Sequence, residues 1–112
     1  MALDDDVLID QDVRAALDGQ LLVKKGISSS SMYGGVGYLV DDQPFAVLLE
    51  GVVGMRLPAE LQRQAMPLAG VSPLRPPFAD EPIPGWLQFM LILPDDLPEL
   101  MPWIDAALED AR

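Results

Sequence analysis

Six of the eleven prolines in this 112-residue chain fall between positions 67 and 84, and they set the strongest limit on its fold. Proline lacks the N–H group that a helix interior or a central strand must donate. We therefore expect a surface loop there, with at most one short edge strand over residues 71–74. The stretch "PLRPP" (73–77) fits a PxxP ligand motif formally, but a surface loop explains it better.

The first part of the chain predicts a helix. In "DDDVLIDQDVRAALDGQLLVKKG" (4–26), acidic residues gather at the start and Lys24 and Lys25 stand at the end, as a helix dipole favours. Gly26 is a natural stop, and Gly19 could break the helix in the middle. One apolar stripe at helical spacing contains Ile9, Val13, Ala16, Leu17 and Leu21.

An antiparallel meander is predicted next. The segments "MYGGVGYLV" (32–40) and "PFAVLLEG" (44–51) flank the polar turn "DDQ", and "VVGMRLP" (52–58) supplies a third strand. Serines 28–31 are interpreted as a linker into the first strand. The stretch "PAELQRQAM" (58–66) predicts a short helix with Pro58 at its first position.

Beyond the proline-rich segment, a strand and a helix are predicted. The near-continuous apolar run "GWLQFMLILP" (85–94) indicates a strand buried on both faces. Asp96 and Glu99 have capping-box spacing, but Pro102 would clash inside a helix begun there. We expect a tight turn from 96 and a regular helix from near Met101 or Pro102. Its core-facing residues are Leu100, Trp103, Ile104, Ala107, Leu108 and Ala111.

These elements predict one α+β domain over residues 1–112. It has an antiparallel sheet of about four or five strands, N- and C-terminal helices and a short middle helix, with the helices mainly on one face.

Charge and composition exclude several classes of function. Seven basic against 18 acidic residues give a net charge of −11, which disfavours direct nucleic-acid binding and anionic membranes. The chain has no cysteine and no histidine, so we expect no thiol chemistry, no metal site and no cofactor. The N-terminus does not resemble a signal peptide, and no apolar run approaches the ~20 residues of a membrane helix. A cytoplasmic location is expected.

The stretch Gly34-Gly35-Val36-Gly37 could be a phosphate loop or a structural feature of the sheet. A phosphate loop must open a helix, whereas Gly37 is followed by the strand "YLV". A bend in the strand, or close packing by a helix, is the better interpretation.

Other candidate groups have structural explanations. A Ser–Lys dyad with Lys24 or Lys25 is conceivable, but these lysines belong to a helix end. The carboxylate pairs Asp41-Asp42 and Asp95-Asp96 stand where turns and caps favour aspartate. Trp86 and Trp103 are predicted at the core or its edge. Core filling is likewise predicted for Met32, Met55, Met66, Met90 and Met101.

The segment "SMYGGVGYLVDDQPFAVLLEGVVGMRLP" resembles the signature of the TfoX (Sxy) N-terminal domain family. That signature has a helix leading into a Met-aromatic-Gly-Gly motif, two strands and a strand that carries an arginine. The strand entry and the ending "LPELMPWIDAALEDAR" are also similar, over roughly residues 7–112. The matching positions are Met32, Tyr33, Gly34, Gly35, Arg56, Gly85, Trp86 and Trp103.

The resemblance implies an α+β fold related to YjbR-like proteins. Full-length members regulate competence genes as transcriptional coactivators and carry a second, C-terminal domain. A chain with only the first domain is expected to be a stand-alone member, for which the family offers no catalytic residues.

The leading hypothesis is a non-enzymatic, cytoplasmic interaction or regulatory module, tied to transcription through an unidentified protein partner. Its binding surface would be an exposed sheet edge or the 67–84 loop, and a homodimer is compatible with it. The alternative is a small anionic-ligand binder, or a minor carboxylate-dependent enzyme, in which Arg56 and Arg75 contact the anion.

Overall fold

The computed structural model describes residues 9–76 and 79–112, which form an antiparallel sheet with helices packed on it. The helices are α1 (Gln11–Leu21), α2 (Ala59–Ala65) and α3 (Leu97–Ala111), with a 3-10 turn at Pro94–Asp96. The strands are β1 (Ile27–Met32), β2 (Gly35–Val40), β3 (Gln43–Leu49), β4 (Val52–Arg56), β5 (Ser72–Pro73) and β6 (Trp86–Met90). The order across the sheet is β1-β2-β3-β4-β6-β5, with every neighbouring pair antiparallel. The predicted α+β class is confirmed.

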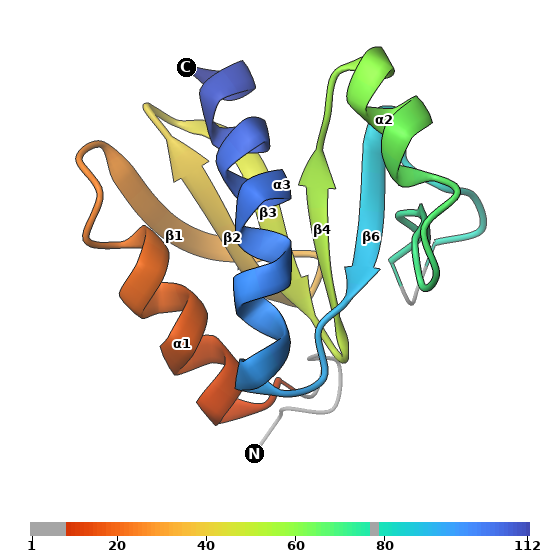
Figure 1. Cartoon of the computed structure of the whole chain (residues 1–112). Coiled ribbons are helices and arrows are strands. Elements are labelled where there is room, and N and C mark those ends of the chain that lie inside the picture. Colours follow the sequence, from red (N-terminus) through yellow and green to blue (C-terminus); the bar gives the residue numbers. More distant parts are fainter. Residues whose placement is uncertain (1–8, 77–78) are drawn as a thin grey trace.

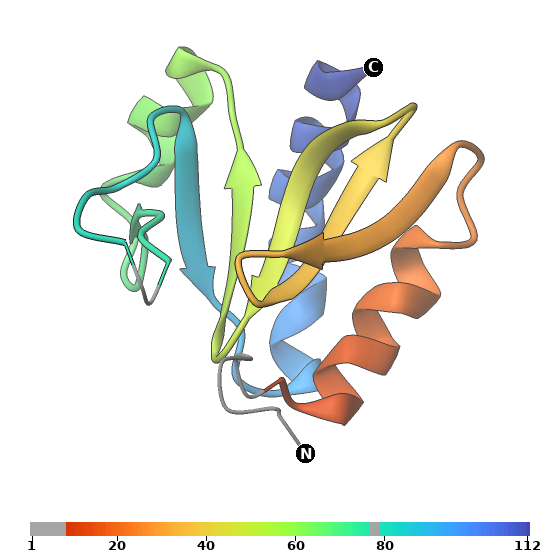
Figure 2. The same cartoon turned by 180° about the vertical axis from the view of Figure 1, so that it is seen from behind.

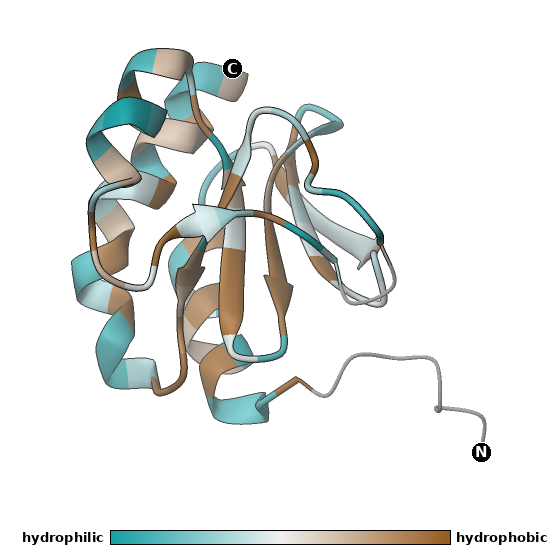
Figure 3. Ribbon diagram, turned by 90° about the vertical axis from the view of Figure 1, so that its right-hand side faces the viewer, coloured by the Kyte–Doolittle hydropathy of each residue, from teal (hydrophilic) through white to brown (hydrophobic). Residues whose placement is uncertain are grey.

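Two layers make up the molecule. Helices α1 and α3 cover one face of the sheet, while α2 lies near the end of β4 and the start of β6 (Figure 1). Brown, apolar segments of helix and sheet face each other between the layers (Figure 3). The main core joins Leu17 and Leu21 of α1 and Ile104 of α3 to Tyr38 and Met55 of the sheet. This arrangement confirms the apolar stripes predicted for both long helices.

A smaller cluster lies on the opposite face. It contains Val47, Leu49, Leu74 and Trp86, and half-buried Met32 packs against it. Figure 2 shows the β1–β2 hairpin curling over this side of the sheet. Leu74 belongs to the proline-rich segment, so this loop covers part of the sheet rather than standing free.

The strand count is higher than predicted because the serines are not a linker. Residues 27–32 form β1, which pairs in register with β2. The Met-Tyr-Gly-Gly motif is the turn between these strands: Tyr33 and Gly34 have φ values of 53° and 80°. Both residues of a type I′ hairpin turn need positive φ, so the motif directs the chain into a tight hairpin.

The second glycine of the motif permits a close approach between strands. A Cβ on Gly35 would overlap the backbone carbonyl oxygen of Leu48 and lie 2.8 Å from Leu49 Cδ2. The predicted close packing is therefore present, but the packing element is β3 and not a helix.

Three predictions about the long helices need correction. Helix α1 ends at Leu21, so Gly26 is not its stop, and Lys24 and Lys25 lie in the turn that follows it. Helix α1 passes through Gly19 without a break and begins after Asp10, whose carboxylate accepts from the N–H groups of Asp12 and Val13. Its predicted start at residues 4–6 lies outside the described residues. Helix α3 begins at Leu97 and includes Pro102. Pro102 removes only the bond to the Pro98 carbonyl and lies on the exposed side, where water can reach that carbonyl.

The apolar run after Gly85 is also shorter as a strand than predicted. Strand β6 ends at Met90, and the N–H groups of Ile92 and Leu93 donate to Asp96 Oδ2 at 3.2 and 3.0 Å. Asp96 therefore holds the preceding turn instead of forming a capping box with Glu99. Burial on both faces is found at Trp86 and Leu87 but not at Met90, which is 55% exposed.

A partly buried side-chain hydrogen bond links helix α1 to the sheet, in addition to the apolar packing. The Tyr38 hydroxyl donates to Asp18 Oδ1 at 2.6 Å, and Asp18 Oδ2 lies 3.5 Å from Arg14 Nε. Burial, and then the Asp18 carboxylate, raise the pKa of Tyr38 above its ordinary value. The hydroxyl is therefore protonated at neutral pH and acts as the donor.

Replacing Tyr38 by Phe is expected to lower the free energy of unfolding by about 1.5–3 kcal/mol, because a hydrogen bond to a charged acceptor is lost. Urea denaturation measures this change. Asp18→Asn keeps an acceptor at the same place and should lose less stability. An unchanged midpoint for Tyr38→Phe would show that the bond contributes nothing.

Candidate functional site

Strand β1 is an edge strand that is paired on one side only. Its six residues pair with β2 from Ile27 opposite Val40 to Met32 opposite Gly35. Within residues 9–76 and 79–112, no strand pairs with its other side. The Gly26 carbonyl accepts from the Asp41 N–H at 3.2 Å, so Gly26 faces β2. Because facing alternates along an antiparallel strand, Ser28 and Ser30 also direct their backbone groups to β2, and Ser29 and Ser31 direct theirs outward.

This edge carries none of the features that usually protect an edge strand. Proteins block such edges with charged residues, prolines, bulges or very short strands. The opposite edge follows this rule, because β5 has two residues and one of them is Pro73. In contrast, β1 has no charged residue, no proline and no register shift against β2, and its four serines are exposed. The edge is therefore open to another extended chain.

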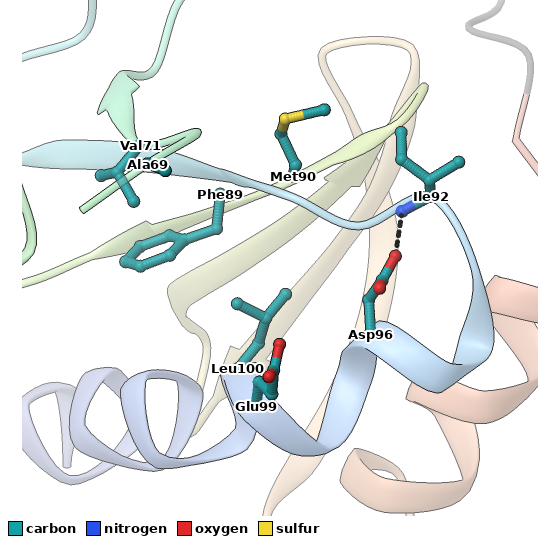
Figure 4. Close-up of a pocket in the computed structure, with 8 residues that line it drawn as sticks. All are labelled: Ala69, Val71, Phe89, Met90, Ile92, Asp96, Glu99 and Leu100. Carbon is teal, nitrogen blue, oxygen red and sulfur yellow. Dashed lines mark hydrogen bonds between the residues drawn. The ribbon is translucent and has the colours of Figure 1, made fainter.

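A hollow lined by both apolar and acidic side chains is the second candidate site (Figure 4). It has a volume of about 300 Å³ and lies between the segment after α2, the end of β6 and the start of α3. Phe89 forms its buried floor and contacts the Trp103 ring at a centroid distance of 5.7 Å. The lining residues are Ala69, Val71, Phe89, Met90, Ile92, Asp96, Glu99 and Leu100.

Apolar side chains are exposed around this hollow. Met90 is 55% exposed and Ile92 48%, and both line the hollow. Leu68, Leu93 and Met66 are exposed as well but do not line it. Five methionines were predicted to fill the core. The prediction is wrong for Met66 and Met90, which are exposed, whereas Met55 is buried. Periodicity could not show that Met90 and Ile92 are exposed, because the apolar run "FMLIL" (89–93) contains no polar residue to mark a solvent-facing side.

The family-motif residues do not converge on one site. Tyr33 and Met32 lie at the β1–β2 turn, and Arg56 stands opposite Trp86 in the β4–β6 register. The Gly85 carbonyl accepts from the Leu57 N–H at 3.1 Å. Trp103 packs on the helix-covered face, while Trp86 belongs to the cluster on the other face.

The two arginines proposed as anion contacts do not meet in any of the cavities found among the described residues. Arg56 is half-buried on β4 and takes part in neither of the two ion pairs found among the described residues. Arg75 is exposed, and its backbone N–H donates to Gln88 Oε1 at 3.2 Å. Within residues 9–76 and 79–112, neither arginine lines the hollow or the cavities beside α2, beside β6 and at the β3–β4 turn.

The paired carboxylates occupy turns. Asp41 and Asp42 both have positive φ, 49° and 70°, and form the hairpin turn between β2 and β3. Asp95 and Asp96 lie in the 3-10 turn before α3. In the described part of the chain, no group of three acidic residues is placed to hold a metal ion, and no helix is long and apolar enough to cross a bilayer.

Comparison with models of known protein families gives no match to this chain, and comparison with curated proteins gives none either. The resemblance to the TfoX N-terminal domain therefore rests on the motif residues alone.

Proposed function

We propose that this chain is a non-enzymatic, cytoplasmic interaction module that regulates a protein partner by adding an extended segment of that partner to β1. The observation that carries the proposal is the open edge of β1: its six residues pair with β2 on one side, and no strand of the described part of the chain pairs with the other. Strand addition uses the outward backbone groups of such an edge. The resemblance to TfoX domains supports a regulatory role in transcription, exerted through a protein and not through DNA.

The charge of the chain agrees with this proposal. A net charge of −11 repels phosphate backbones, while the β1 segment itself is neutral. A partner strand can therefore approach β1 without placing like charges in direct contact. A second copy of the chain could use the same edge, which would give a homodimer with a sheet continuous across both copies.

Proline placed at an outward position tests the edge directly. Ser29→Pro removes an N–H that points away from β2, so we expect the partner to be lost and the free energy of unfolding to change by less than about 1 kcal/mol. Ser30→Pro removes an N–H that faces β2 and should destabilise the domain by about 3 kcal/mol. Thermal unfolding separates the two variants.

Binding is measured by capture from the native cytoplasm and by sedimentation equilibrium, with wild type, Ser29→Pro and Ser29→Thr. Threonine keeps the backbone N–H and should retain whatever wild type binds. If Ser29→Pro recovers the same proteins and has the same mass as wild type, the edge is not the binding surface.

A further inference from the structure

We propose that the hollow beside β6 binds an apolar side chain of a partner polypeptide that is flanked by lysine or arginine. This goes beyond strand addition, because it concerns a different surface. The hollow lies between the segment after α2, the end of β6 and the start of α3, whereas β1 is the far edge strand of the sheet (Figure 1).

The apolar part of the hollow fits a side chain. Its floor is the buried Phe89 ring, with half-buried Leu100 beside it, and Met90 and Ile92 form an exposed rim. A volume of about 300 Å³ is at the lower end of small-ligand sites, which span roughly 300–1,000 Å³. That is room for one large apolar side chain and its neighbours. Apolar residues grouped at a cavity in this way are typical of contact surfaces.

The charged part of the hollow selects the flanking residues. Asp96 and Glu99 are its only charged lining residues, and both are acidic. Asp96 Oδ2 accepts hydrogen bonds from the N–H groups of Ile92 and Leu93 (Figure 4). Glu99 is exposed and belongs to neither of the two ion pairs found among the described residues. A lysine or arginine beside the anchor can lay its aliphatic stem along Met90 and bring its charge to Glu99.

The same charges argue against the other occupants. A second copy would bring its own carboxylates against this rim, with a net charge of −11 on each chain. A neutral apolar segment would cover Glu99 without pairing it, which carries a desolvation penalty. A basic partner alone satisfies both the apolar floor and the acidic rim.

Three capped pentapeptides test this directly: Gly-Lys-Leu-Lys-Gly, Gly-Glu-Leu-Glu-Gly and Gly-Lys-Ser-Lys-Gly. Binding to the full chain is followed by NMR of the Met90 and Ile92 methyl groups at low salt. The Lys-Leu-Lys peptide should bind about tenfold or more tightly than either of the others, because only it supplies both anchor and charge. Added salt should reduce this difference. Equal affinity for the lysine- and glutamate-flanked peptides would overturn the proposal.

Variants place the effect at the hollow. Glu99→Gln should weaken Lys-Leu-Lys binding about three- to fivefold, whereas Asp105→Asn, an exposed carboxylate on the same helix that does not line the hollow, should leave it unchanged. Ser29→Pro should also leave it unchanged, which separates this site from the β1 edge. If butylammonium binds as tightly as the peptide, the site takes a small organic cation and the polypeptide partner is excluded.

Discussion

Gly35→Val is expected to lower the free energy of unfolding by about 3 kcal/mol or more, a large share of the stability of a domain of this size. Gly35 does not have positive φ, so the effect is steric and not conformational. Any Cβ at this position would overlap the Leu48 carbonyl oxygen, and a β-branched residue adds methyl groups near Leu49. The overlap is with backbone of the central strand β3, which cannot rotate away as a side chain could.

Urea denaturation followed by circular dichroism measures the loss, with Gly19→Ala as the control. A Cβ at Gly19 meets nothing within 4 Å, and the residue lies in the last turn of α1. Alanine there should stabilise the domain by about 0.5–1 kcal/mol. If Gly35→Val instead folds with the wild-type midpoint and has lost only ligand affinity, the motif is a binding loop and not a structural one.

Phe89→Ala is expected to have the second large effect, a loss of about 3–5 kcal/mol. Phe89 is 2% exposed, faces the main core from β6 and packs against Trp103 of α3. Truncation removes the apolar surface that joins the sheet to this helix. It also leaves a cavity at the floor of the hollow, because the surrounding residues of the sheet and of α3 can fill the space only in part.

The adjacent residue provides the matched control for this prediction. Met90 follows Phe89 on the same strand but points to the other face and is 55% exposed. Met90→Ala should change the free energy of unfolding by less than about 0.5 kcal/mol. Comparable losses for both variants would mean that the exposed rim, and not the floor, holds β6 in place.

Local patterns predicted most of the fold. The stripe at Val13, Leu17 and Leu21 identified the inner face of α1, and the aspartates at 41 and 42 identified a hairpin turn. Both signals are local, because they depend on spacing along the chain and on which residues tolerate positive φ. The extent of α3 was wrong for a related reason. The rule against Pro102 does not include exposure, and exposure depends on which side of the helix meets the sheet.

The candidate sites could not be predicted from local sequence patterns to the same extent. Four consecutive serines have no hydrophobic alternation, so nothing marked residues 28–31 as a strand. They form a strand because the turn at Tyr33 and Gly34 brings them alongside residues 36–39 of β2. The hollow depends on Ala69, Met90 and Glu99, which come from three separate segments.

The sequence by itself determined the α+β class, the turns and the inward faces of the helices, because these follow from periodicity, proline placement and glycine geometry within short segments. Only the tertiary structure decided that β1 is an open edge and that Met90 and Ile92 are exposed beside two carboxylates. Edge position and exposure depend on which segments pack together. Long-range packing, unlike periodicity, leaves no regular pattern along the chain.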